Sequence, residues 1–330
     1  MLILYIEKKD DIVNNIKNKI NAKNMKYIIT GGAGFVGTGL TGRLAKAGHI
    51  VYVLDIRSVS TKGYSPDAAS RVISIPIDLL HSSPEISVCE GADVIIHLAG
   101  ATIFKRWTES YKKLILDSRI ITLKNLLSTI NKCTRKPKVC VSASANGYYG
   151  EGGESILNES SSNGDDFLAG VCAEWESVLS IARDLGMRTA SVRTSVVLGA
   201  GGFLDILIPM YRFYLGGRLG SGMQWFSWIH VDDLISLYEY FSLEKKISGP
   251  VNAVAPENIR NKDFTRILAE TLNRKAPWII PKFMIKIILG EFGDSALSSQ
   301  RVESIILNKT DFHFKYPDVR SALKAVAHKR

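Results

Sequence analysis

A strand-like segment that runs directly into a cluster of glycines constrains this chain more than any other feature. Residues 27–30 are β-prone, and five glycines fall within the next nine positions, 31–39. Two registers fit, GxxGxxG and GxGxxG, and both are typical of a strand that turns tightly into a helix. The first glycine permits the turn, the middle one lets a diphosphate approach the backbone, and the last lets the helix pack on the strand.

The helix expected after this turn, at 35–47, begins with free N–H groups and the positive end of its dipole, which together favour phosphate. An acidic residue, Asp55, ends the next predicted strand 18 residues after Gly37. A strand before, a helix after and an acid at this distance together predict dinucleotide binding. The cofactor-binding residues expected at the turn are Gly31, Gly34, Phe35, Val36 and Gly37.

The choice between NAD and NADP depends on two side chains at the end of the second strand. Asp55 can accept hydrogen bonds from a ribose diol and would repel a 2′-phosphate, which favours NAD. Arg57 lies two residues further on and could instead bind that phosphate. On this electrostatic ground we expect NAD, and NADP remains open.

Strands and helices alternate from Met25 to about residue 200. This alternation predicts an α/β protein with a Rossmann-type, doubly wound parallel sheet. We expect a 1–24 extension, a 25–200 dinucleotide-binding domain, and a smaller, interleaved substrate-side region at 201–330. The predicted strands are 27–30, 50–55, 71–75, 92–100, 138–144 and 188–194, and the predicted helices are 35–47, ending at Gly48, 109–131 and 165–185.

Composition narrows the function classes. The net charge is +10, but the 14 Lys and Arg and 7 Asp and Glu of residues 260–330 are scattered through an amphipathic pattern, so we expect no nucleic-acid partner. No apolar run reaches the length of a membrane span, which predicts no membrane partner. The four cysteines show neither a CxxC pair nor metal-ligand spacing, so we expect reduced thiols, no metal and a cytoplasmic protein.

Several motifs resemble those of extended short-chain dehydrogenases/reductases. TGGAGFVG matches TGxxGxxG, and RWTESYKKLILDSRIITLKNL, SASANGYYGEGGE, VRTSVVLGAGGFL and LGSGMQWFSWIHVDDL are similar to the atypical "epimerase family protein" branch, also labelled nucleoside-diphosphate-sugar epimerase-like. The likeness runs from about Met25 to Leu323. It implies that two copies could pair through the helices 109–131 and 165–185. It also implies further cofactor contacts at Asp78, Leu79, Leu98, Ala99, Gly100, Ser118 and Ser142.

The usual catalytic pair of this superfamily, Tyr-x-x-x-Lys, is missing. Phe167 and Val171 stand at the matching positions, and no lysine occurs between Lys138 and Lys245. Neither side chain can carry a proton, whereas the usual pair supplies a general acid or base. We therefore expect Ser144 and Tyr148 to be the catalytic candidates, as groups that polarise a reacting oxygen.

Two functions remain open on the sequence. The first is an NAD(P)-dependent oxidoreductase or epimerase acting on an unidentified, small and conceivably anionic substrate. The second is a silent dinucleotide-binding sensor or scaffold, which labels of some relatives link to cell division. The residues expected on the substrate side are Arg193, Trp228 and His230.

Overall fold

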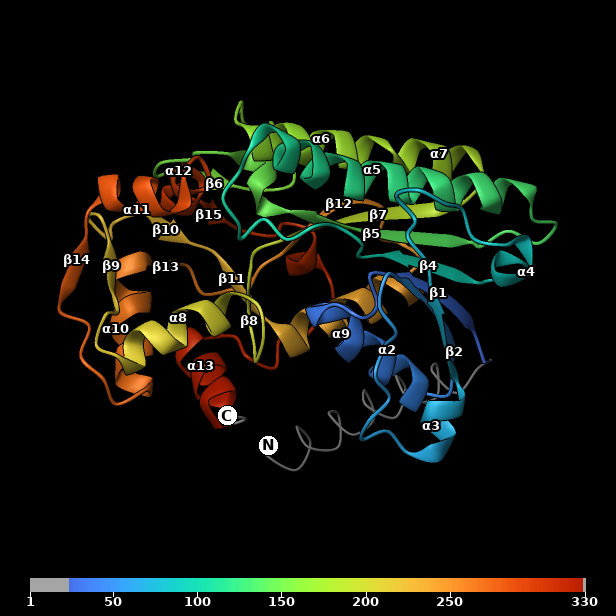
Figure 1. Ribbon diagram of the computed structural model, residues 1–330, viewed down its shortest axis with the longest axis horizontal. Coiled ribbons are helices and arrows are strands. Elements are labelled where there is room, and N and C mark those ends of the chain that lie inside the picture. Colours follow the sequence, from blue (N-terminus) through green and yellow to red (C-terminus); the bar gives the residue numbers. More distant parts are fainter. Residues whose placement is uncertain (1–23, 329–330) are drawn as a thin grey trace.

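The computed structural model describes residues 24–328, and a seven-stranded parallel sheet organises them (Figure 1). The strand order is β12-β7-β5-β4-β1-β2-β3, so the connection direction reverses between β1 and β4. This is the doubly wound arrangement, and the predicted Rossmann-type fold class is confirmed. The strands are β1 (Lys26–Thr30), β2 (Ile50–Asp55), β3 (Val72–Pro76), β4 (Val94–His97), β5 (Val139–Ala145), β7 (Arg188–Thr194) and β12 (Gly249–Ala253).

Helices cover both faces of the sheet (Figure 1). Successive strand residues point to opposite faces, so Tyr27 and Ile29 pack with α2 and α9, whereas Ile28 packs with α5 and α7. Gly48, at φ +91°, follows the end of α2 as its position in the sequence predicts. The flanking helices are α2 (Phe35–Lys46), α3 (Pro66–Ser70), α4 (Ile86–Cys89), α5 (Glu109–Lys132), α6 (Phe167–Ser177), α7 (Leu179–Asp184) and α9 (Val231–Leu243).

Two elements differ from the sequence-based expectation. The single helix predicted at 165–185 consists of α6 and α7, which meet at Val178, a residue that keeps helical angles of φ −61° and ψ −23°. The strand predicted at 92–100 is shorter, because only β4 pairs with its neighbours. Beyond it, the backbone of Leu98 and Ala99 passes directly over the glycine turn after β1.

The region after residue 200 both completes the sheet and builds a second core. β12 is the last strand of the sheet, paired with β7. α8, α10 and α13 enclose a separate apolar cluster around Trp228 and Phe264. The remaining elements are the short strand β6 (Ile156–Leu157) and those that follow β7 in the chain: β8 (Val196–Leu198), α8 (Phe203–Arg212), β9 (Gly217–Leu219), β10 (Trp225–Phe226), β11 (Trp228–His230), β13 (Ile259–Arg260), α10 (Asn261–Thr271), β14 (Trp278–Ile280), α11 (Lys282–Leu289), α12 (Phe292–Leu297), β15 (Arg301–Val302) and α13 (Val319–His328).

Candidate functional site

The glycine turn between β1 and α2 is built so that only glycine fits. Gly31 has φ +70°, and a Cβ there would lie 2.7 Å from the Ala99 nitrogen. A Cβ on Gly37 would meet the Gly31 carbonyl oxygen, so the helix could not approach the strand. Gly34 is the N-cap of α2, and no side chain of the described residues caps this end. The first-turn N–H groups of Phe35, Val36 and Gly37 are therefore left without a side-chain cap in the described chain, the arrangement that suits a phosphate.

Asp55 and Arg57 flank this turn. The two carboxylate oxygens of Asp55 accept hydrogen bonds from the backbone nitrogens of Ala33 and Arg57, each at 3.0 Å. The guanidinium of Arg57 is exposed, and one nitrogen donates to the Ala33 carbonyl at 3.2 Å. The carboxylate thus shapes the loop, and the cation stands next to it with further N–H groups free of protein partners in the described chain.

The resemblance-derived cofactor residues line the same edge. The Asp78 carboxylate accepts the Leu80 N–H at 2.9 Å, and the Leu79 carbonyl accepts the Asn125 side chain at 2.8 Å, which ties this loop to α5. The Leu98 backbone lies against Gly31, and the Ala99 nitrogen is 3.4 Å from Thr30 Oγ1. This segment, expected to contact the cofactor, is therefore packed against the glycine turn.

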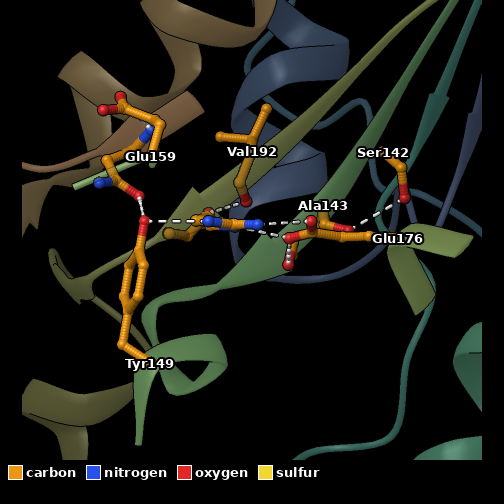
Figure 2. A network of polar contacts seen from close by, with 10 residues as sticks. Ser142, Ala143, Tyr149, Glu159, Glu176 and Val192 are labelled. Carbon is orange, nitrogen blue, oxygen red and sulfur yellow. Dashed lines mark hydrogen bonds and ion pairs between the residues drawn. The ribbon is translucent and has the colours of Figure 1, made fainter. Parts of the chain in front are cut away.

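Three further predicted cofactor residues are placed by hydrogen bonds and burial. Ser118 Oγ, on α5, accepts the Ala101 N–H at 2.9 Å and so fixes the chain just after exposed Gly100. Ser142 is 1% exposed on β5 and donates to the Ala143 carbonyl at 2.9 Å (Figure 2). Its hydroxyl proton is thus already used within the protein.

A cavity of about 350 Å³ lies where the carboxyl ends of β5 and β7 meet the C-terminal region. Phe35, at the start of α2, belongs to its wall and connects it to the glycine turn. We call it the switch-point cavity, because its wall reaches from the ends of β5 and β7 to Phe35, beside the switch point between β1 and β4 at which doubly wound sheets bind ligands. The wall also includes residues 145–147 at the end of β5, residues 194–197 from the end of β7 into β8, and Phe203, Phe226 and Phe292 from the C-terminal region.

The positions of the missing Tyr-x-x-x-Lys pair are filled by apolar packing. Val171 lines the cavity. Phe167 packs edge-on against Trp107, with 5.2 Å between ring centroids, in a cluster that also contains Phe292. Cys172, which follows Val171 in α6, also lines the cavity, and burial raises the pKa of its thiol to about 11. It is therefore protonated near neutral pH and is a poor nucleophile.

A buried polar network joins β5, β7, β12 and α6 (Figure 2). The Arg193 guanidinium binds both carboxylate oxygens of Glu176, at 2.8 and 2.9 Å, and donates to the Tyr149 hydroxyl at 3.1 Å. Tyr149 in turn donates to Asn252 at 2.7 Å. Burial alone would lower the pKa of Arg193, but the hydrogen bonds and charge of Glu176 outweigh it and raise that pKa. Arg193 is thus permanently charged, and its hydrogen bonds link the end of β7 to α6 and to Tyr149 after β5.

Both predicted catalytic residues contact this network. Ser144 is 3% exposed and donates its hydroxyl proton to Glu176 at 2.7 Å. The Tyr148 ring stacks on Arg193, with the guanidinium carbon 3.4 Å from the ring centroid. Within the described chain, neither residue belongs to the cavity wall. Ser144 contacts Glu176 and Tyr148 contacts Arg193, the two members of one ion pair. The catalytic role of Ser144 and Tyr148 stays a prediction.

Sequence reasoning missed Glu176, although a signal for it exists. Cys172, Trp175 and Leu179 are the buried stripe of α6 and α7, and Glu176 lies within that stripe at helical spacing. A carboxylate on a buried stripe requires a buried cation. Arg193 was expected on the substrate side. The acidic group that it contacts is Glu176 of this helix, 17 residues away in the sequence.

The remaining substrate-side predictions, Trp228 and His230, lie in the second core. They are 0% and 1% exposed on β11, which pairs with β8. His230 Nδ1 accepts the Asp232 N–H at 3.1 Å at the start of α9, and its ring packs on Tyr316. Among the described residues, this segment contributes Trp225, Phe226 and Ser227 to the cavity wall, and neither Trp228 nor His230 belongs to it.

Two other features are absent from residues 24–328. No cluster of three or more His, Cys, Asp or Glu side chains is arranged to hold a metal ion in that range. None of its helices is both long enough and apolar enough to span a bilayer.

The strand order, the glycine turn and the switch-point cavity define a Rossmann-type dinucleotide-binding α/β protein. The chain belongs to the NAD dependent epimerase/dehydratase family, whose model matches residues 27–253. Residues 280–326 match a second model, a domain of unknown function (DUF1731). The resemblance drawn from the motifs is thereby confirmed.

Relatives cover almost the whole chain. Similarity is 35% identity over 306 residues with the epimerase family protein SDR39U1 homolog, chloroplastic, of Arabidopsis thaliana, spanning 92% of this chain and 86% of that protein. With epimerase family protein YfhF of Bacillus subtilis it is 35% over 300 residues, spanning 91% and 97%. The structure of human epimerase family protein SDR39U1 with NADPH superposes with a TM-score of 0.80 at 30% identity, covering 93% of this chain and 100% of that one.

Proposed function

We propose that this protein is an NADP(H)-dependent oxidoreductase or epimerase-like enzyme that acts on a small molecule bound in the switch-point cavity. The observation that carries the proposal is the continuity of the two sites. Phe35 is both the first residue of the phosphate-facing helix and part of the cavity wall. A cofactor held at the turn would supply a hydride at that wall.

The choice of NADP(H) over NAD(H) rests on Asp55 and Arg57. The Asp55 carboxylate is engaged by two backbone N–H groups, so fewer of its lone pairs remain for a ribose diol. Arg57 stands beside the turn with exposed donors that suit a 2′-phosphate. The human relative solved with NADPH supports the same choice. The proposal thus departs from the electrostatic preference for NAD drawn from the sequence.

Nucleotide titration of the full chain tests both parts of the proposal. Tryptophan fluorescence is expected to change on addition of NADPH, with NADH binding about tenfold or more weakly, because a charge-assisted contact is worth roughly 1.5–3 kcal/mol. Arg57→Ala should remove that preference. Lys62→Ala, an exposed loop cation nearby in sequence, should keep it. Failure to bind either nucleotide would refute the cofactor site, and tighter NADH binding would refute the choice.

A sensor that binds the cofactor without turnover is the second candidate, and the packing of Phe167 and Val171 favours it. These side chains place hydrocarbon at the positions that match the superfamily's usual Tyr-x-x-x-Lys pair, and Ser144 gives its proton to Glu176. If a substrate is turned over, Ser144→Ala is expected to reduce kcat by about 10²-fold or more, provided that Ser144 takes part in proton transfer. Unchanged turnover would limit Ser144 to holding Glu176.

A further inference from the structure

The cavity wall is dominated by hydrocarbon. Aromatic rings from six separate segments line it, and neighbouring members are in contact, as with Phe104 and Phe292, whose ring centroids are 5.6 Å apart. Such a wall excludes water and complements a flat or compact apolar body. Its large apolar members include Phe35, Ile103, Phe104, Phe203, Phe226 and Phe292.

Two charged side chains, Arg119 and Asp166, interrupt this apolar lining. Arg119 is the one basic residue of the described wall, and no carboxylate of residues 24–328, Asp166 included, lies within ion-pair distance of it. Two guanidinium nitrogens donate to main-chain carbonyls, those of Ile115 at 2.8 Å and Ala101 at 3.0 Å. Burial lowers the pKa of this group, but a guanidinium keeps its proton at neutral pH. A desolvated cation without a counter-charge is unfavourable, and an anion would relieve that cost.

A hydrogen-bond donor beside Arg119, the indole N–H of Trp175, lacks an acceptor in the described chain. The Arg119 guanidinium carbon lies 5.1 Å from the centroid of the Trp175 ring. Trp175 is 5% exposed and lines the cavity, yet its indole N–H has no hydrogen-bond partner in the described chain. Buried donors are rarely left unpaired in folded proteins. A ligand with two acceptor oxygens could satisfy both groups at once.

From this juxtaposition we infer that the substrate is a compact organic monoanion, with a carboxylate held by Arg119 and Trp175 and an apolar body against the aromatic wall. The inference rests on the proposed function, because it concerns the ligand of the same cavity. It disfavours a nucleoside diphosphate sugar, whose two phosphates would have to share the single cation that the described wall provides.

Matched pairs of probes test the inference on the full chain saturated with NADPH. Benzoate and benzamide, cinnamate and cinnamamide, and 1-naphthoate and 1-naphthamide differ within each pair in charge but little in shape. Calorimetry should show the carboxylate binding roughly 10- to 100-fold more tightly than the amide in at least one pair. UDP-glucose should bind more weakly than that carboxylate. Equal or reversed affinities in all three pairs, or tighter binding of UDP-glucose, would overturn the inference.

Substitutions test whether Arg119 and Trp175 are the side chains that bind the carboxylate. Arg119→Met, which keeps the length of the side chain, and Trp175→Phe, which keeps a ring but removes the N–H, should each reduce the carboxylate preference about tenfold or more. Arg212→Met, an exposed arginine on α8, and Trp278→Phe, whose N–H is already donated to the Tyr214 carbonyl, should leave it unchanged.

NADPH titration of the same variants separates this inference from the proposed function. If the unmodified chain and the variants all bind NADPH but none prefers a carboxylate over its amide, the inference is wrong and the cofactor site stands. If Arg119→Met instead weakened NADPH about tenfold, the guanidinium would serve the cofactor diphosphate, and the inference would fall. Absence of NADPH binding in the unmodified chain would contradict the proposed function itself.

Discussion

At Gly31 the backbone leaves no room for any side chain. Its φ of +70° is costly for other residues, and a Cβ would lie 2.7 Å from the Ala99 nitrogen. We expect Gly31→Ala to lower the free energy of unfolding by roughly 2–4 kcal/mol, because strain and steric overlap add. It should also abolish nucleotide binding. Urea denaturation and NADPH titration measure the two effects.

Gly63 provides the control for this substitution. It has φ +84°, but no atom lies within 4 Å of a Cβ built there. Gly63→Ala should therefore carry the backbone penalty alone, about 1–2 kcal/mol. Equal losses for the two variants would show that overlap with the segment after β4 is not what requires glycine at the turn.

His97 predicts how stability responds to acid. It is 0% exposed at the end of β4, with Nδ1 2.7 Å from Thr30 Oγ1 and Nε2 3.1 Å from the Arg119 carbonyl oxygen. Burial lowers its pKa from 6.5 to about 4. Between these values the unfolded chain binds a proton that the folded chain does not, so stability is retained above pH 6.5 and falls as the pH drops toward 4.

The expected contribution of His97 is a loss of roughly 3 kcal/mol on going from pH 7 to below pH 4, since one pKa unit corresponds to about 1.36 kcal/mol. Urea unfolding at pH 7, 6 and 5 measures the slope. His97→Asn, which cannot take up this proton, should be less stable at pH 7 but show a shallower decline. Parallel curves for the two proteins would rule out His97 as the source.

At the scale of an element, α11 separates buried from exposed positions on one short helix. Ile285 is 4% exposed and Ile287 is 68% exposed. Ile285→Ala should cost about 2–4 kcal/mol, because it removes buried hydrocarbon and leaves a cavity. Ile287→Ala should change the free energy of unfolding by no more than about 0.5 kcal/mol. Comparable losses in urea titrations would mean that Ile287 is covered by another surface.

The sequence predicted elements well where a period is long enough to detect. Strands were predicted at residues 50–55 and 188–194, and β2 and β7 have those bounds. The two- and three-residue strands of the C-terminal region, such as β10, are too short to show a period. β12 was not assigned, because Gly249 and Pro250 resemble a turn, although proline is tolerated on an edge strand such as this one.

Site residues divide in the same way. Those of the glycine turn were predicted because adjacent residues build it, and the structure places them together. Arg119, Trp175 and Glu176 were not selected, because their significance comes from contacts that the sequence does not reveal. Arg119 is notable only because no acid folds against it, and Glu176 only because β7 brings Arg193 to it. Contacts between distant segments require the three-dimensional arrangement.

Across the whole molecule, the two predicted domains share one core. Leu237 and Phe241 of α9 pack in the same apolar cluster as Ile29 and Leu40, and all four are fully buried. β12 also covers the edge of β7. A chain cut at residue 200 would expose both this apolar face and an unpaired strand edge, which favours aggregation.

We therefore predict that residues 25–200 alone will not form a stable domain. Each large buried side chain that loses its partners costs about 2–5 kcal/mol, and several such losses exceed the 5–15 kcal/mol that usually stabilises a protein. The fragment should show no cooperative urea transition and should elute as aggregates in gel filtration, whereas the full chain unfolds cooperatively. Coexpression with residues 201–330 should restore a soluble complex, because the missing strand and helix are returned. A cooperative, monomeric 25–200 fragment would contradict the shared core and support an independent dinucleotide-binding domain.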